Sequence, residues 1–147
     1  MKFFSQTQWN LKNCVIFLDV DGTLVGEGGS KLDKASLKAF SKLKKNNTLI
    51  LCSNSPKKER TQKLAEQLNV DWTKGSHKKP HKEVLGELKF PKNKKKVMIG
   101  NLFCIDGRFA KNISAQFFPV KTVVSPHEAW PNKFFYIIDR YFFSLWI

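Results

Sequence analysis

Two aspartates separated by one residue follow an apolar run near the start of the chain. Asp19 and Asp21 come at the end of this run, and Gly22 and Thr23 come directly after them. An apolar run of this kind predicts a buried β-strand, here over 14–20. Alternate residues of a strand point to the same side. We therefore expect both carboxylates to project from the carboxyl end of one strand, where open α/β sheets place their active sites.

The residues around these aspartates predict a site for a cation and a phosphate. Two carboxylates that converge repel each other strongly unless a cation lies between them. Hard oxygen ligands of this kind suit Mg²⁺ best. Gly22 allows a sharp backbone turn, and Thr23 adds a hydroxyl and an amide that can bind a phosphate group.

The spacing Asp-x-Asp-Gly-Thr-Leu after an apolar strand resembles motif I of the haloacid dehalogenase (HAD) superfamily of phosphotransferases. The resemblance implies a Mg²⁺-dependent phosphomonoester hydrolase in which Asp19 is the nucleophile and forms an aspartyl-phosphate. It implies that Asp21 is the general acid and base. It also implies a doubly wound, Rossmann-like three-layer α/β sandwich with a central parallel sheet and no cap domain.

A second apolar run, over 48–52, ends in Ser53 and Asn54. An apolar strand that ends in serine resembles HAD motif II. The resemblance implies that Ser53 donates its hydroxyl to the phosphoryl group. For Asn54 we expect one of two roles, orienting Asp19 or contacting the substrate.

A pair of lysines precedes a proline and a helix that we expect to run through about residue 89. A Lys-Pro pair that opens a helix resembles HAD motif III, where a fixed cation must neutralise the nucleophile and the transferring phosphoryl group. Lys79 is favoured because it directly precedes the proline, and Lys78 is the alternative. His77 and His81 are expected to be solvent-exposed or capping residues.

A third apolar run, over 97–99, leads to Asn101 and Asp106 in a segment that resembles HAD motif IV. Asp106 occupies the second acidic position, and Asn101 replaces the first acid. Asparagine still offers a carbonyl oxygen to Mg²⁺, but it carries no charge, so metal affinity should fall. The resemblance implies that Mg²⁺ is held by Asp19, the backbone carbonyl of Asp21, Asn101 and Asp106.

Apolar runs alternate with helical segments, which fits a doubly wound parallel sheet. We expect a lead-in over 1–13, a HAD-like catalytic domain over 14–124 and an aromatic-rich tail helix over 125–147. The loop over 26–30 is too short to hold a cap domain, so the site should be open on that side. The other expected elements are a helix near 34–45 capped by Asp33, a helix near 57–69, and strands near 70–73 and 115–124.

Charge and cysteine usage restrict the class of protein. Lys+Arg 26 against Asp+Glu 12 gives a net charge of +14, which implies an anionic partner. A phosphoester substrate, an anionic membrane and a nucleic acid all remain open. The odd number of cysteines, each beside an apolar run, predicts reduced core residues. With no apparent signal peptide or membrane span, we expect a cytoplasmic protein, with peripheral membrane association as the alternative.

The tail over 134–147 carries only two charges, and its apolar residues surround the whole helix. At about 1.5 Å per residue it is too short to span a bilayer easily. Three interpretations remain open: a helix that completes the core, a helix in a membrane interface, and a dimer contact. A basic body beside an aromatic tail would suit an enzyme that dephosphorylates an anionic lipid.

The segments Lys-Lys-Pro-His and Gly-Asn-Leu-Phe-Cys-Ile-Asp resemble HAD subfamily IIIA, within it the branch that includes phosphatidylglycerophosphate phosphatases. This resemblance implies hydrolysis of an anionic lipid phosphate. One alternative is a phosphatase for nucleic-acid ends or phosphoproteins. The other is a catalytically weakened HAD scaffold that binds anionic partners, for which Asn101 is the direct support.

Overall fold

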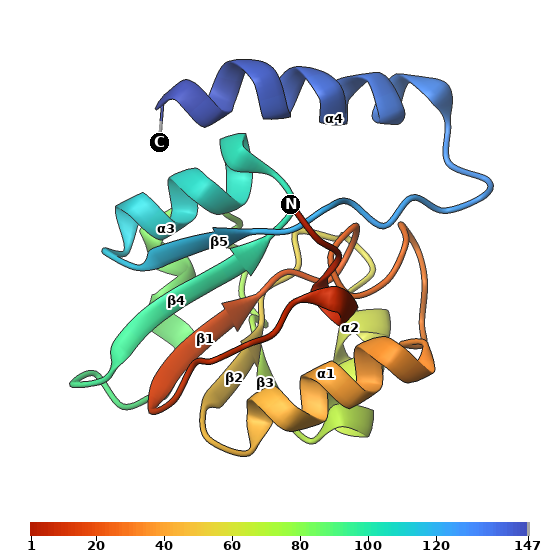
Figure 1. Ribbon diagram of the computed structural model, residues 1–147. Helices are drawn as coiled ribbons and strands as arrows, with labels where there is room; N and C mark the ends of the chain where they lie inside the picture. The colour runs from red at the N-terminus through yellow and green to blue at the C-terminus, as the bar shows by residue number, and fades with distance from the viewer. Residues whose placement is uncertain (147) are drawn as a thin grey trace.

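The apolar runs of the sequence form one all-parallel sheet of five strands in the order β3-β2-β1-β4-β5 (Figure 1). The computed structural model describes residues 1–146, so Ile147 of the expected tail lies outside the described residues. This topology is a Rossmann-like, HAD-like α/β fold, which confirms the fold class expected from the sequence. The strands are β1 (Cys14–Leu18), β2 (Thr48–Leu51), β3 (Asp71–Trp72), β4 (Lys95–Gly100) and β5 (Gln116–Pro119).

Alternation along the central strand β1 builds two cores, one on each face of the sheet. Ile16 and Leu18 belong to a cluster with apolar residues of α1 and α2. Val15 and Phe17 belong to a second cluster with residues of α3 and of a 3₁₀ turn. All four side chains are fully buried, as expected for a parallel strand covered on both faces. These covering elements are α1 (Lys34–Lys44), α2 (Lys58–Leu68), α3 (Arg108–Asn112) and the 3₁₀ turn Lys82–Glu87.

Local signals in the sequence set the ends of the two long helices on one face. The Asp33 carboxylate accepts a bond of 2.6 Å from the Ser36 N–H, so Asp33 is the predicted N-cap of α1. Asn69 adopts a left-handed conformation with φ of 50° and ends α2, a role that asparagine fills at little steric cost. Both helices therefore lie where the sequence predicts them.

Two expected elements are shorter than the sequence suggests. The helix expected from Pro80 to about residue 89 is only the 3₁₀ turn Lys82–Glu87. Gly86 within the turn and Pro91 after it both disfavour a longer helix. The strand expected over 115–124 is restricted to Gln116–Pro119, and its ladder stops at Pro119, which has no N–H to donate.

The elements beyond the sheet lie mainly above its carboxyl edge. Residues 19–33, between β1 and α1, form turns and hold no inserted domain. The helix α4 (Trp130–Phe142) crosses the top of the molecule, above the ends toward which the strands point (Figure 1). Among residues 1–146, no helix is long and apolar enough to cross a membrane. Single helical turns complete the chain at Phe4–Gln6, Phe103–Gly107 and Phe143–Trp146.

Candidate active site

The strand order gathers the predicted site residues at the carboxyl edge of the sheet. Because β1 lies between β2 and β4, Asp19 has Ser53 on one side and Asn101 on the other. The Asp19 N–H still donates to the Ile99 carbonyl at 2.9 Å, so the backbone of Asp19 is fixed by the neighbouring strand. The Asp19 side chain is buried, with the residue 7% exposed.

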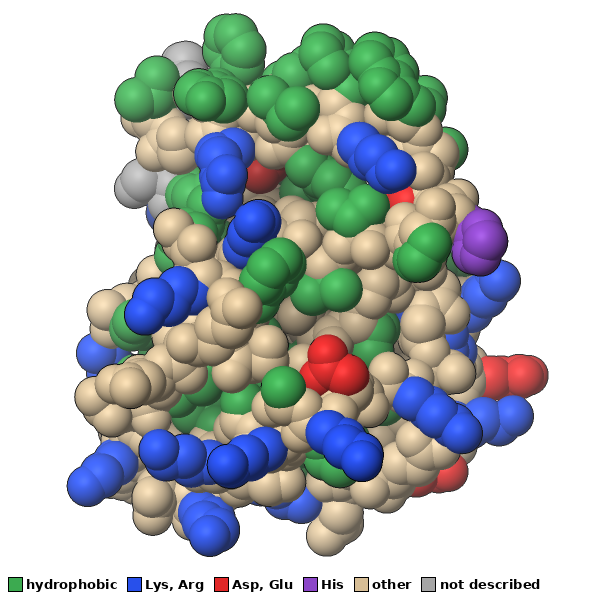
Figure 2. Space-filling model, turned by 45° about the vertical axis from the view of Figure 1, so that its right-hand side comes forward, with side chains coloured by type: hydrophobic (Ala, Val, Ile, Leu, Met, Phe, Trp, Pro, Cys, Tyr) green, Lys and Arg blue, Asp and Glu red, His purple; other side chains and the backbone are tan. Residues whose placement is uncertain are grey.

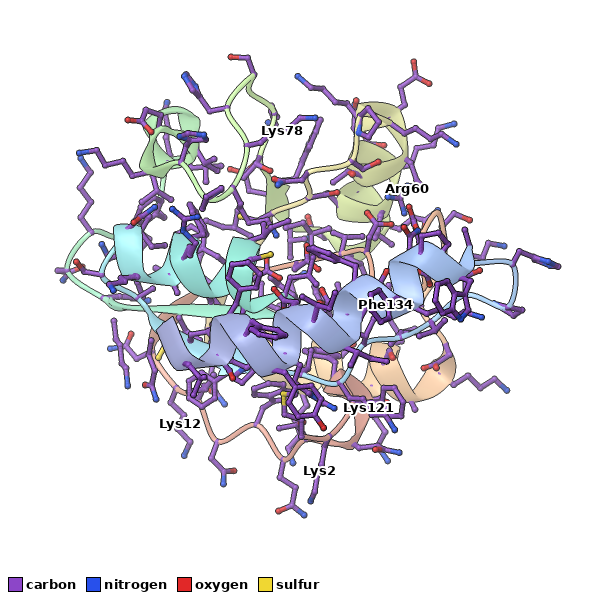
Figure 3. All side chains as sticks on the ribbon, turned by 90° about the horizontal axis from the view of Figure 1, so that it is seen from above. Lys2, Lys12, Arg60, Lys78, Lys121 and Phe134 are labelled. Atoms are coloured by element: carbon purple, nitrogen blue, oxygen red, sulfur yellow. The ribbon has the colours of Figure 1, made fainter. Side chains whose placement is uncertain are left out.

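Lys79 joins two of the predicted aspartates. Its ammonium Nζ lies 2.7 Å from Asp19 Oδ1 and 2.5 Å from Asp106 Oδ1. The Lys79 side chain is buried, whereas Lys78, the alternative cation, is exposed and is labelled on its loop in Figure 3. The structure therefore brings Lys79, and not Lys78, to the candidate nucleophile.

Burial controls the electrostatics of this triad. It raises the pKa of the Asp19 carboxyl to about 7, because the raising effects of burial and of the Asp106 charge exceed the lowering effect of Lys79. For Lys79 burial alone would lower the pKa, but the carboxylates of Asp106 and Asp19 outweigh burial and raise it. Lys79 is therefore a permanent cation beside a carboxyl group of unusually high proton affinity.

Asp106 is held in place by the backbone around it. Its Oδ2 accepts a bond of 3.1 Å from the Leu102 N–H, while its Oδ1 contacts Lys79. A Cβ at Gly100 would collide with this carboxylate, so the last residue of β4 must lack a side chain. The close approach of strand and carboxylate explains why a glycine precedes Asn101.

The Asp21 carboxylate contacts a different basic side chain from the one that contacts Asp19. Its two carboxylate oxygens accept bonds of 2.8 and 2.6 Å from Arg60 Nη2. Ser53 Oγ lies within 3.3 Å of Asp21 Oδ2, and the Gly28 N–H donates to Oδ1 at 3.1 Å. Both aspartates line the same cavity, as expected, but β1 ends at Leu18, so strand alternation does not set the direction of Asp21 in the following turn.

Arg60 was not among the predicted site residues. It lies in the first turns of α2, behind the motif that carries Ser53. The usable signal was its rarity, since it is one of three arginines in a chain whose other basic residues are lysines. A guanidinium is suited to a two-pronged carboxylate contact, which lysine does not supply.

Of the two predicted substrate-binding residues, Thr23 lies behind the site, whereas Asn54 lines the cavity. Thr23 is completely buried, and its hydroxyl donates to Asp19 Oδ2 at 2.8 Å instead of facing the cavity. The Asn54 side chain forms its hydrogen bonds with Lys79 and not with Asp19. Its side chain accepts from the Lys79 N–H and donates to the Lys79 carbonyl, each at 2.9 Å. Thr23 therefore positions the candidate nucleophile, and Asn54 positions the cation.

The fit of Mg²⁺ depends on the oxygens that remain near Asp19. Asp19 Oδ2 and Asn101 Oδ1 both lie within bonding distance of Thr23 Oγ1, at 2.8 and 3.3 Å, so two hard oxygens converge there. The Asp106 carboxylate forms an ion pair with Lys79, and the Asp21 carboxylate forms one with Arg60. Across residues 1–146, no three acidic, histidine or cysteine side chains are grouped to hold a metal ion. The donors fit Mg²⁺ in type, but with less negative charge than the sequence predicted.

A cavity of about 460 Å³ opens above these residues. Its floor includes Asp19, Lys79 and Asp106, and its wall includes Arg60. The tail helix α4 also contributes to the lining, through Asn132, Phe135 and Tyr136. The loop over 26–30 holds no cap domain, as expected, and the C-terminal helix forms another part of the cavity wall.

No protein-family model matches the sequence, and a search of curated proteins finds no significant relative. The fold is similar to a chain in the solved structure of the Pnkp1/Rnl/Hen1 complex, with a TM-score of 0.52 and 15% sequence identity. The match covers 81% of this chain and 50% of that chain, so this chain spans half of its length. At this identity the similarity concerns the fold.

Proposed function

We propose that this protein is a phosphomonoester hydrolase that forms an aspartyl-phosphate on Asp19. The observation that carries the proposal is the buried ammonium of Lys79 between Asp19 and Asp106. A fixed cation at a strand-end carboxylate is suited to neutralise a phosphoryl group as it transfers. The HAD-like sheet places this pair at the edge where α/β enzymes bind substrates.

The proposed reaction uses two carboxylates in two steps. An oxygen of Asp19 attacks phosphorus, the bond to the leaving oxygen breaks, and Asp21 gives that oxygen a proton. Water then attacks the aspartyl-phosphate, Asp21 takes the proton of that water, and inorganic phosphate leaves. In the structure Asp21 accepts two bonds from Arg60, so it must exchange part of this contact for a proton before the first step.

Other residues near Asp19 and Asp21 bind charge. Lys79 offsets the charge of the phosphoryl oxygens, and Ser53, which now contacts Asp21, is within reach as a hydroxyl donor. Mg²⁺, when bound, would supply further charge neutralisation at the phosphoryl oxygens. Asp19 and Asn101 are the residues that would hold it.

The first experiment is phosphate release from a generic aryl phosphate with added Mg²⁺, comparing wild type with Asp19→Asn. We expect the variant to lose at least about a thousandfold in rate, because it removes the nucleophile. Equal rates would place the activity elsewhere. No release by either protein would favour the alternative of a weakened scaffold that binds anionic partners.

Asn101→Asp tests that alternative both by melting temperature and by rate. The added carboxylate lies beside Asp19, so repulsion should lower the melting temperature in a chelator. Mg²⁺ should then raise the melting temperature more in the variant than in wild type. A large gain in rate with this variant would identify the natural chain as a weakened enzyme, and an unchanged or lower rate would mean that Asn101 belongs to a working site.

Two substrate classes follow from different observations. The net charge of +14 supports a phosphorylated nucleic-acid end, and the solved chain of similar fold belongs to the Pnkp1/Rnl/Hen1 complex. An anionic lipid phosphate, such as phosphatidylglycerophosphate, is supported by the apolar exterior of α4 beside the cavity. Rates on a 5′- or 3′-phosphorylated oligonucleotide and on the lipid in detergent micelles separate the two.

A further inference from the structure

The helix α4 has its polar side turned toward the protein and its apolar side turned toward solvent. Five residues spaced three or four apart form what we term the apolar stripe, and their exposed fractions lie between 49% and 84%. This spacing places the four that belong to α4 along one side of it, and the fifth lies in the turn Phe143–Trp146 that follows. Figure 2 shows hydrophobic side chains gathered in a band across the top of the molecule. The apolar stripe consists of Trp130, Phe134, Ile137, Tyr141 and Leu145.

Polar contacts on the opposite side fix α4 in this orientation. Asp139 is buried, and its carboxylate accepts bonds of 2.7 and 2.8 Å from the N–H groups of Phe103 and Cys104. The Tyr136 hydroxyl donates to the carboxylate of Glu128. Rotating the helix to bury the apolar stripe would break these contacts. The exposure of the stripe therefore follows from how the helix is anchored.

The exposed charges of α4 itself are of one sign, and the exposed acid Glu27 contacts Asn132 on the opposite side of the helix from the apolar stripe. The only acids over 125–146 are Glu128 and Asp139, and both are buried. Lys133 and Arg140 are exposed and, at helical spacing, follow one edge of the stripe. Lys/Arg side chains lie directly beneath the hydrophobic band in Figure 2. The surface around the stripe is thus basic.

We propose that the apolar stripe docks α4 on an anionic lipid bilayer, with the helix lying along the surface. Aromatic and aliphatic side chains would enter the headgroup region, while Lys133 and Arg140 would contact anionic headgroups. A second copy of the chain is a poorer occupant, because two molecules of charge +14 repel each other. The cavity lies on the inner side of the same helix, so docking holds the site next to the lipid surface.

The docking is independent of the proposed hydrolysis, because no residue of the apolar stripe lines the cavity. It is measured as flotation of the full chain with vesicles of phosphatidylcholine alone or mixed with phosphatidylglycerol. We expect binding to the mixed vesicles. The double variant Phe134→Ser/Tyr141→Ser should bind them at least about tenfold more weakly. Lys133→Gln/Arg140→Gln should lose the preference for the anionic vesicles.

The matched control is Leu37→Ser/Val124→Ser, which replaces two apolar residues of similar exposure outside the stripe, 45% and 44%. It should bind vesicles as wild type does, and unchanged melting temperatures show that all variants are folded. Equal binding by the control and stripe variants, or no vesicle binding by wild type, would overturn the proposal.

A dimer in light scattering that the stripe variant abolishes, without vesicle binding, would assign the stripe to a second copy. Binding to a single-stranded oligonucleotide but not to vesicles would assign the basic surface to nucleic acid.

Discussion

Asp19 combines two properties that oppose each other in an isolated carboxyl group. It lies 2.7 Å from a lysine ammonium, yet burial raises its pKa to about 7. The lysine fixes the position of the carboxylate, and burial preserves its basicity. A carboxylate with both properties is better suited to attack phosphorus than one at the protein surface.

The raised pKa of Asp19 predicts the pH dependence of the proposed hydrolysis. Only the ionised carboxylate attacks phosphorus, and Mg²⁺ bound to Asp19 would lower its pKa. With Mg²⁺ well below saturation, the value of kcat/KM should therefore fall by about tenfold for each pH unit below about pH 7. Because the Asp106 charge contributes to the raised pKa, Asp106→Asn should move this limb to lower pH. The measurement is a pH–rate profile on an aryl phosphate. A profile flat down to pH 5 would contradict the raised pKa.

Arg60 is predicted to orient Asp21. Replacing it by glutamine removes the two-pronged contact with both carboxylate oxygens. Asp21, the proposed general acid and base, would then be less firmly oriented, so kcat should fall by about ten- to hundredfold. Lys63→Gln, on the same helix but outside the cavity, is the control for lost positive charge and should leave kcat unchanged. Equal kcat in both variants would mean that Asp21 needs no partner.

At the scale of secondary structure, α4 is tied to the turn that carries Asp106. Asp139 on α4 accepts the N–H groups of Phe103 and Cys104 at the start of this turn. Asp106 in turn contacts Lys79, and Lys79 contacts Asp19. The tail helix is therefore linked to the candidate nucleophile by a chain of polar contacts.

The reactivity of the Cys104 thiol shows whether Asp139 holds α4 against the rest of the protein. Burial and the hydrogen bond with Asp139 raise its pKa to about 12, so labelling by iodoacetamide at pH 9 should be slow. Asp139→Asn should lower this pKa and speed the labelling of Cys104 by at least about tenfold. Cys52, whose pKa burial also raises to about 12, should stay slow in both proteins. Site-resolved mass spectrometry gives both rates, and an unchanged Cys104 rate would show that Asp139 does not anchor the helix.

At the scale of the whole molecule, stability depends on the packing on both sides of β1. Phe17 is fully buried and packs edge to face on Phe90 and Phe109, with ring centroids 5.5 and 6.1 Å apart. Phe17→Ala should lower the free energy of unfolding by about 3–5 kcal/mol. Urea unfolding measures the change. Leu37→Ala on the exposed side of α1 should change it by less than about 0.5 kcal/mol, and equal losses in both would contradict this view of the core.

The sequence by itself determined the sheet and the identity of most residues gathered at its edge. Apolar runs and helical spacing are local signals, so they predicted all five strands and the helices α1 and α2. Strand ends meet at one edge of a parallel sheet, which is why Asp19, Ser53 and Asn101 could be placed together. Lys79 was identified from the proline that follows it.

Only the tertiary structure decided how these side chains are paired. Arg60 reaches Asp21 from a helix 39 residues away in sequence, and no local pattern encodes that contact. Thr23 donates to Asp19, and Asn54 binds the backbone of Lys79, because the turns around them are packed against neighbouring strands and loops. Alternation along a strand does not describe such turns. The outward apolar side of α4 likewise depends on the distant partners of Asp139. Periodicity shows that a helix has different sides, but contacts with the rest of the fold decide which side is buried.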